Sequence, residues 1–246
     1  PHNYFSFIIL IFMKNKNFVK KIRNLIKLFL NETLYFLKIK NDPDFFFKKI
    51  KGLIHIGANE GQERDKYKKY SLSVAWVEPI PEVFEQLKRN IADYSDQKAF
   101  KYLLTDQDDK EVELKISNNN GASSSILDLG LHKHIWPSVN YINSIKLKSL
   151  TLNTLINKES LNIKDYQALI IDTQGSELLV LKGASEILLN INYVVTEAAD
   201  FESYVGCCKI DDLSEFLGKY GFKEISRKKF AHHKKAGNYY DVIYGK

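Results

Sequence analysis

The order of short apolar segments and longer amphipathic segments constrains the fold of this chain more than any other feature. From Lys51 onward, runs rich in β-branched residues alternate with stretches of helical periodicity. This alternation is typical of βαβ units, which build a parallel sheet. The predicted strands lie near residues 52–57, 73–78, 98–104, 168–173, 192–197, 222–230 and 238–244. The predicted helices lie near residues 60–70, 81–94, 176–189 and 210–219.

The last two predicted strands are separated only by the Lys- and His-rich segment 232–237. Strands joined so closely should form an antiparallel hairpin. The sequence therefore predicts a Rossmann-like α/β fold, a doubly wound sheet of seven mostly parallel strands that ends in a C-terminal antiparallel hairpin. With 246 residues, the chain suits one such domain at residues 51–246, preceded by an N-terminal extension of residues 1–50.

An insertion near residues 107–164 interrupts the alternation between the third and fourth core strands. It contains strand-like pieces at Glu111–Ile116 and Ile145–Leu150, with the polar run Asn118–Ser125 between them. In open α/β sheets, loops at the carboxyl ends of the strands line the ligand crevice. We therefore predict that this insertion forms a lid over the substrate.

The positive charge of the chain is concentrated in the N-terminal extension. Between Met13 and Ile50, ten Lys and Arg residues face only three acidic residues, and the whole chain carries a formal net charge of +6. The remaining domain is therefore nearly neutral, whereas a nucleic-acid enzyme usually carries its basic patch on the folded domain. This distribution argues against a nucleic-acid partner.

Apolar residues of the extension recur at helical spacing and predict a basic amphipathic helix. These residues are Phe18, Ile22, Leu25, Ile26, Phe29 and Leu30. Two interpretations stay open. In the first, residues 13–40 bind the surface of an anionic membrane. In the second, the helix packs against the folded domain or a partner subunit.

The first residues of the chain resemble neither a membrane span nor a signal peptide. The apolar run from Tyr4 to Phe12 is far shorter than the ~20 residues that cross a bilayer, and lysines follow it instead of preceding it. We interpret Met13 as the natural start, so that residues 1–12 are not native. The two cysteines, Cys207 and Cys208, are adjacent and cannot join distant parts of the fold. These features predict a cytoplasmic protein, peripheral at the inner face of the membrane if the extension binds lipid.

The strongest local signal is the segment Leu53–Gly61, in which a buried strand breaks into a glycine turn that opens a helix. Glycine at positions 57 and 61 lets the backbone approach a ligand closely, and the amides of the following helix can face an anionic group. Glu78 ends the second strand about twenty residues later, where a carboxylate can accept both ribose hydroxyls. An NAD-binding unit would carry a third glycine where Gln62 stands, which disfavours NAD.

Polar residues also end the other predicted strands. Thr105 and Asp106 end the third strand, where a polar side chain can meet an adenine amino group, although Asp106 equally suits a solvated turn. Asp172 ends the fourth core strand, Glu177 enters the next helix, and Glu197 ends the fifth strand. Carboxylates delivered to a crevice by apolar strands are candidates for acid-base chemistry on a substrate hydroxyl.

Two spaced motifs make the chain similar to the FkbM family of methyltransferases over roughly Leu53 to Tyr244. The glycine-turn motif of that family matches Gly57, Ala58, Asn59 and Gly61. Its strand-end acid followed by proline matches Glu78, Pro79 and Pro81. Its second signature matches Asp172, Gly175, Glu177, Leu178, Leu181, Lys182 and Gly183. The chain departs from the family at two positions, because His55 stands where Asp is usual and Gln174 where Glu is frequent.

The resemblance implies a class I methyltransferase fold and S-adenosylmethionine as the cofactor. Together with the strand-end positions, it places the cofactor on His55, Gly57, Ala58, Asn59, Gly61, Glu78, Pro79, Thr105 and Asp106. Because Gln174 cannot act as a general base, that role moves to Asp172, Glu177 or Glu197, unless the reaction needs no base. His55 either bonds the loop or the cofactor, or is a structural histidine at the strand end.

The polar run of the insertion offers hydrogen-bond donors and acceptors for a sugar-like acceptor, although Ser and Asn runs are often only loops. The predicted substrate-binding residues are Asn119, Ser123, Ser124, Ser125 and Gln174. Aromatic residues for a stacking wall are Trp136, Tyr141 and Tyr204. The histidine pairs at 132 and 134 and at 232 and 233 lack a third ligand at a recognisable spacing, so no metal site is predicted.

We therefore expect an enzyme that methylates a hydroxyl of a sugar, a glycan or another small hydroxylated molecule. Two alternatives stay open. The first is a non-catalytic domain that binds the cofactor or a glycan within a membrane-associated assembly. The second is an NAD-dependent oxidoreductase.

Overall fold

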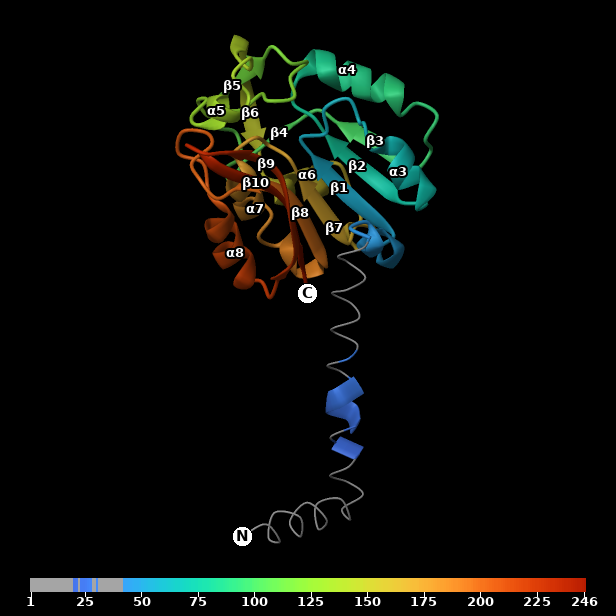
Figure 1. Ribbon diagram of the computed structural model, residues 1–246. Helices are drawn as coiled ribbons and strands as arrows, with labels where there is room; N and C mark the ends of the chain where they lie inside the picture. The colour runs from blue at the N-terminus through green and yellow to red at the C-terminus, as the bar shows by residue number, and fades with distance from the viewer. Residues whose placement is uncertain (1–19, 22, 28–29, 31–41) are drawn as a thin grey trace, which may run out of the picture. The chain divides into compact units, whose positions relative to one another are not determined.

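The computed structural model describes residues 20–21, 23–27, 30 and 42–246 (Figure 1). The contacts divide the chain into two units, Pro1–Phe45 and Phe46–Lys246. In the first unit, the described residues between 20 and 30 are helical, and the apolar side chains of Leu25, Ile26 and Leu30 are more than half exposed. None of the helices in the described ranges is long and apolar enough to cross a bilayer.

Three of the residues predicted for the amphipathic helix, Phe18, Ile22 and Phe29, lie outside the described residues. The two interpretations of residues 13–40 therefore stay predictions. The same holds for Met13 as the natural start and for the predicted division of the chain at residue 50.

The second unit is built on a seven-stranded sheet in the order β3-β2-β1-β7-β8-β10-β9. Its strands are β1 (Gly52–Ile56), β2 (Ser73–Val77), β3 (Gln97–Phe100), β7 (Ala168–Ile171), β8 (Tyr193–Ala199), β9 (Lys223–His233) and β10 (Gly237–Gly245). The strands from β3 to β8 in this order are parallel, whereas β10 runs antiparallel to β8 and forms a hairpin with β9. The predicted doubly wound sheet with a C-terminal antiparallel hairpin is thus confirmed.

The helices differ more from the prediction than the strands do. They are α3 (Arg64–Lys69), α4 (Pro81–Asn90), α5 (His132–Ile135), α6 (Leu152–Lys158), α7 (Glu177–Lys182) and α8 (Ile210–Gly218), with the 3-10 helices η1 (Phe45–Lys49), η2 (Ile163–Asp165) and η3 (Ile187–Asn190). The predicted helix 176–189 divides into α7, which ends at Lys182, and η3, which begins at Ile187. Gly183 lies between them, where a Cβ would be 2.2 Å from the carbonyl oxygen of Thr105. The two helices α5 and α6 inside the insertion have no counterpart in the prediction.

Each face of the sheet carries its own apolar core, because side chains alternate between the two faces of a strand. One core joins Ile54 and Ile171 to residues of α6, α7 and α8. The other joins Leu53 and Trp76 to η1, α3 and α4. The carboxyl ends of the central strands therefore lie between two helical layers (Figure 1).

The insertion forms a second, three-stranded sheet in the order β4-β6-β5. Its strands are β4 (Leu103–Leu104), β5 (Glu111–Ser117) and β6 (Tyr141–Leu150), so both predicted strand-like pieces are present. The third predicted strand, 98–104, is divided between the two sheets: β3 pairs with β2, and β4 pairs with β6. This division brings the insertion next to the carboxyl end of the main sheet.

Candidate active site

Gly57 shapes the turn that follows β1. Its φ of 77° lies in the left-handed region, and a Cβ there would lie 1.8 Å from the carbonyl oxygen of Asp172. Glycine thus allows the ends of β1 and β7 to lie in contact. The amides of Gly57 and Ala58 donate to the carbonyl of Val77, which ties the turn to β2. The expectation that helix amides face this turn does not hold, because α3 begins only at Arg64.

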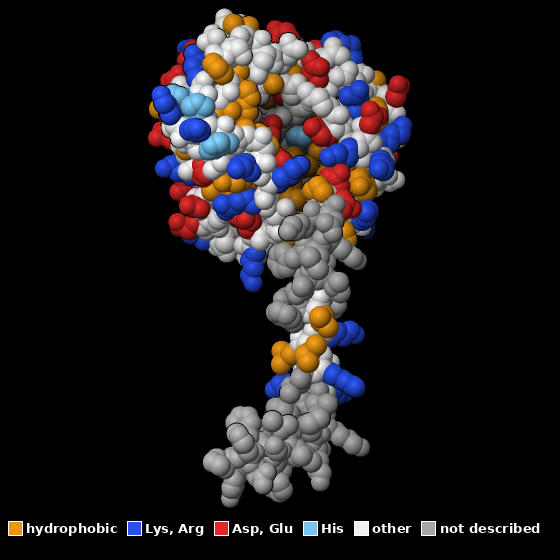
Figure 2. Space-filling view, in the orientation of Figure 1, with side chains coloured by type: hydrophobic (Ala, Val, Ile, Leu, Met, Phe, Trp, Pro, Cys, Tyr) orange, Lys and Arg blue, Asp and Glu red, His pale blue; other side chains and the backbone are white. Residues whose placement is uncertain are grey.

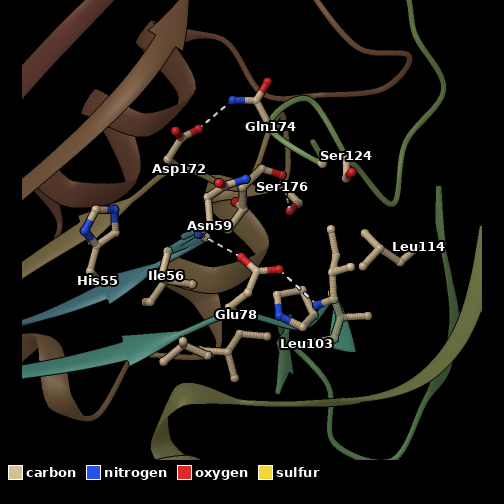
Figure 3. Close-up of a pocket in the computed structure, with 18 of the residues that line it drawn as sticks. His55, Ile56, Asn59, Glu78, Leu103, Leu114, Ser124, Asp172, Gln174 and Ser176 are labelled. Atoms are coloured by element: carbon tan, nitrogen blue, oxygen red, sulfur yellow. Dashed lines mark hydrogen bonds between the residues drawn. The ribbon is translucent and has the colours of Figure 1, made fainter. Parts of the chain in front are cut away.

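Glu78 directs its side chain into the cavity beside this turn (Figure 3). The two carboxylate oxygens accept hydrogen bonds from the amides of Asn59, at 2.8 Å, and Ile80, at 2.9 Å. Burial raises the pKa of Glu78 to about 7, and the two amide hydrogen bonds oppose this rise. Each oxygen keeps a further lone pair with which to accept a ligand hydroxyl.

One wall of the same cavity is apolar. Ile80, Leu103 and Leu114 form a small cluster that lines it, and Leu103 and Leu114 lie on the same side of Glu78 in Figure 3. A flat apolar ring can pack against such a wall. These residues escape prediction because Leu103 and Leu114 reach the site through the pairing of β4 and β5 with β6, which no local pattern reveals.

Thr105 and Asp106 line a different cavity, together with Lys110 and Leu179. The hydroxyl of Thr105 is bonded to the backbone of Gln107. The predicted third strand ends too late: β3 stops at Phe100, and residues 102–104 line the site instead. This placement does not support the predicted adenine contact of Thr105 and Asp106.

A chain of hydrogen bonds leads to Asp172 at the end of β7. The hydroxyl of Tyr204 donates to Oε1 of Gln174 at 2.5 Å, and Nε2 of Gln174 donates to Oδ1 of Asp172 at 2.6 Å. Burial raises the pKa of the Tyr204 hydroxyl, so it stays a donor. The Gln174 amide is thereby oriented with its nitrogen toward Asp172 (Figure 3). Burial raises the pKa of Asp172, and this hydrogen bond opposes the rise.

Glu177 supports the loop after β7. Its Oε1 accepts hydrogen bonds from the amides of Thr173 and Gly175, both at 3.0 Å. The side chain is buried, and burial raises its pKa. These bonds indicate that Glu177 positions the loop that carries Gln174, and they do not support its predicted role as a catalytic base.

Asp172, Glu197 and Asp241 form an acidic row across neighbouring strands. Asp172 follows Ile171, which pairs with Thr196, and Glu197 pairs with Asp241. Paired residues point to the same face of a sheet. Burial raises the pKa of all three carboxyls, and repulsion between their charges raises those of Asp172 and Glu197 further. Figure 2 shows acidic side chains at a hollow in this face of the domain.

Two of the five predicted substrate-binding residues, Ser124 and Gln174, line the main cavity. The other three hold the insertion in place. Asn119 and Ser123 bond each other and Ser117, and the Ser125 hydroxyl donates to the carbonyl of Gln174 at 2.7 Å.

The aromatic residues predicted to form a stacking wall make contacts within the protein. Tyr141 donates to the carbonyl of Leu127. Trp136 and Tyr204 pack against the ring of His132, whose Nδ1 is bonded to Tyr239. Residues 42–246 and the described helical residues contain no group of three His, Cys, Asp or Glu side chains suited to a metal ion.

The sequence family that matches the chain is the methyltransferase FkbM domain, and the match spans residues 55–224. The chain belongs to the FkbM methyltransferase family. None of the curated protein sequences matches it.

The solved structures that are similar to this FkbM domain have low sequence identity to it. An uncharacterized protein from Listeria monocytogenes serotype 4b is 10% identical, with a TM-score of 0.44 over 81% of this chain and 64% of that chain. A putative RNA methyltransferase from Pyrococcus horikoshii is 10% identical, with a TM-score of 0.41 over 88% and 83%. Magnesium protoporphyrin IX methyltransferase from Synechocystis, solved with bound S-adenosylmethionine, is 8% identical, with a TM-score of 0.42 over 79% and 70%.

The cofactor of the family, S-adenosylmethionine, suits the cavity of this FkbM domain. Glu78 has free lone pairs for the ribose hydroxyls, and the wall of Ile80, Leu103 and Leu114 suits the adenine ring. Ala58, Asn59 and Pro79 also line the cavity, whereas Gly61 lies outside it. A Cβ at position 61 would lie 2.7 Å from the side chain of Leu87, so this glycine allows α4 to pack on the turn.

His55, one of the two departures from the FkbM pattern, lines the cavity as a buried ring. Its Nδ1 lies 3.1 Å from the Tyr67 hydroxyl, and the ring stacks on Trp76 with centroids 5.0 Å apart. Burial lowers the pKa of His55 to about 4, so the imidazole is neutral at physiological pH. A neutral ring does not repel the positive sulfonium of the cofactor.

Proposed function

We propose that this methyltransferase acts on a hydroxyl group of a sugar, a glycan or another small hydroxylated molecule. The observation that carries the proposal is the position of Asp172, which lines both the cofactor cavity and the smaller cavity beside Glu197. A hydroxyl next to Asp172 would meet a proton acceptor on one side and the cofactor on the other.

When bound, S-adenosylmethionine supplies a methyl group on a positively charged sulfur. The residues of the chain align the acceptor and take its proton, which is the help that methyl transfer requires. Asp172 would take the hydroxyl proton of the acceptor, and the bound cofactor would supply the methyl group to the acceptor oxygen. The products are a methyl ether and S-adenosylhomocysteine.

The acidic row supports a neutral, hydroxylated acceptor. Carboxyl groups form hydrogen bonds with hydroxyls whether they are ionised or protonated, and this row offers no positive charge to an anionic group. Among the three carboxyls, Asp172 is the proposed base because Gln174 orients it. Glu197 lines the smaller cavity, but burial raises its pKa to about 9, so at neutral pH it holds its proton and would donate a hydrogen bond to the acceptor instead.

A labelled-methyl assay on glycan fractions, together with calorimetry of S-adenosylmethionine binding, tests the proposal. Asp172→Asn should keep cofactor binding and lose about 10²–10⁴-fold in the rate of transfer, the range typical of a lost general base. Asp93→Asn, which removes an exposed carboxylate, should change neither. Cofactor binding without transfer to any fraction would instead favour a non-catalytic binding domain.

A further inference from the structure

The tip of the β9–β10 hairpin carries a basic patch that the proposed chemistry does not use. Its members come from the hairpin and from α5 and are Lys133, His134, His232, His233, Lys234 and Lys235. The rings of His134 and His233 lie 5.4 Å apart between centroids, which joins the two segments. Figure 2 shows histidine and basic side chains gathered at this side of the domain.

Protection of an open sheet edge does not account for the whole patch. β9 is an edge strand, and lysines on edge strands prevent pairing with other chains. That reason suits Lys228 and Lys229 within the strand. It does not suit Lys234 and Lys235, which lie in the turn beyond the last paired residues, or Lys133 on α5.

The charges of the patch are not neutralised by nearby acids. Within residues 42–246, Lys234 and Lys235 form no ion pair, and Lys133 donates only to the neutral amide of Asn140. Asp200 lies against the hairpin, but its carboxylate accepts hydrogen bonds from Asn238 and Tyr240. A cluster of cations without acidic partners attracts an anionic ligand.

The patch and the acidic row lie at two ends of one surface. Asp241 and Gly237 are both in β10, and four residues of strand span roughly 14 Å. Between them, Tyr239 packs with Trp136 and Phe201, and the side chain of Phe230 is 41% exposed. Tyr239 and Phe201 are themselves buried, and Phe230 lies beside Tyr239. A ligand along this path would meet carboxylates first, then the exposed ring of Phe230, then cations.

We propose that the acceptor is a glycosyl phosphate, with its sugar ring at the acidic row and its phosphate on the basic patch. The proposal rests on the proposed methyl transfer to a sugar hydroxyl and names the class of sugar. Lysine ammonium groups bind phosphate as point charges. The acidic row forms hydrogen bonds with hydroxyls and offers no cation to a phosphate, so the two ends of the surface orient the acceptor in one direction.

Calorimetry on the full chain, with S-adenosylhomocysteine present, tests this orientation. The probes are glucose 1-phosphate, UDP-glucose, a short-chain polyprenyl diphosphate glucose in detergent micelles, and methyl glucoside as the phosphate-free reference. We expect the three phosphate probes to bind at least tenfold more tightly than methyl glucoside, and less tightly as salt concentration rises. The probe that binds most tightly identifies the source of the phosphate.

The triple variant Lys133→Gln/Lys234→Gln/Lys235→Gln should lose at least tenfold in affinity for the phosphate probes. A matched control, Lys98→Gln/Lys164→Gln/Lys182→Gln, removes the same charge from exposed lysines elsewhere and includes the other edge strand. Equal affinities in the two variants would overturn the proposal. So would tighter binding of an RNA oligonucleotide than of any sugar phosphate, if the patch variant abolished it.

The same titrations separate this proposal from the proposed function. Failure to bind S-adenosylhomocysteine would contradict the methyltransferase site, whatever the patch does. Normal binding of S-adenosylhomocysteine with no effect of the patch variant would contradict only the glycosyl phosphate.

Discussion

At the scale of single residues, Glu78 determines how the cofactor is held. Its carboxylate must be ionised to accept two ribose hydroxyls, and burial raises its pKa from 4.5 to about 7. Affinity for S-adenosylmethionine should therefore fall as the pH drops through 7, by about tenfold between pH 8 and pH 6. Calorimetry across this range measures the slope.

Substitutions test whether the Glu78 carboxylate causes this pH dependence of cofactor affinity. Glu78→Gln should bind weakly at every pH and show no slope, because an amide does not titrate. Asp172→Asn should keep the slope. If Glu78→Gln retained the pH dependence, the assignment of the ribose contact would be contradicted.

Tyr204 acts on the reaction through Gln174. In Tyr204→Phe, the amide of Gln174 loses the donor that orients it, so the hydrogen bond that lowers the pKa of Asp172 weakens. The acid limb of the kcat profile should then move to higher pH, with kcat roughly tenfold lower at neutral pH and KM for S-adenosylmethionine unchanged. Tyr141→Phe, which removes a hydroxyl bonded to a backbone carbonyl of the insertion, is the control and should leave the limb in place.

An unshifted acid limb in Tyr204→Phe would contradict the positioning role. A merely structural tyrosine would lower activity at all pH values alike.

At the scale of elements, the contact between the ends of β1 and β7 depends on the absence of a side chain at position 57. Gly57→Ala would place a Cβ 1.8 Å from the carbonyl oxygen of Asp172 at a φ of 77°. We expect a loss of about 1–3 kcal/mol in the free energy of unfolding, together with weaker cofactor binding. Urea denaturation measures the first effect and calorimetry the second.

Gly218→Ala is the matched control for this prediction. Gly218 ends α8, its φ is not positive, and a Cβ there would meet no atom within 4 Å. Alanine at such a position stabilises by about 0.4–1 kcal/mol. Equal stabilities of the two variants would contradict the close contact of the strand ends.

The sequence predicts the central strands and the hairpin well because their signals are local. Leu53 to Ile56 and Ala168 to Ile171 are short apolar runs that end in polar residues, so strand and site position are visible together. The break between β3 and β4 is not visible, because it results from pairing with β6 more than forty residues later. Because of this break, Thr105 and Asp106 line a different cavity from Glu78.

The sequence also does not show which polar side chains are already hydrogen-bonded within the protein. Glu177 and Ser125 have the chemistry of site residues, but the structure shows their oxygens bonded to the loop that carries Gln174. Asp241 goes unnoticed in the sequence because it is not at the end of a parallel strand. It joins the acidic row only through the register of β10 with β8.

At the scale of the whole molecule, the buried carboxyls make stability depend on pH. Burial raises the pKa of Glu197 above its ordinary value of 4.5, so the folded state holds a proton that the unfolded state releases. The contribution to stability is therefore full below pH 4.5 and is lost as the pH rises toward the folded pKa. The cofactor-free protein should become less stable from pH 5 to pH 8.

Glu197→Gln removes this titration. The variant should melt at a higher temperature than the wild type at pH 8, by about 2–4 °C for each kcal/mol relieved, and the two should converge near pH 5. Glu202→Gln, at an exposed position, should follow the wild type. A variant that melts below the wild type at pH 8 would show that the Glu197 carboxylate stabilises the fold instead.

The central claim is that one cavity, between the turn at Gly57 and the carboxylate of Glu78, holds S-adenosylmethionine with its sulfur toward Asp172. A crystal structure with S-adenosylhomocysteine tests it most directly. We predict both ribose hydroxyls within hydrogen-bonding distance of Glu78, the adenine ring against Leu103 and Leu114, and the sulfur on the side of Asp172. A ligand bound outside this cavity, or with its ribose away from Glu78, would contradict the claim.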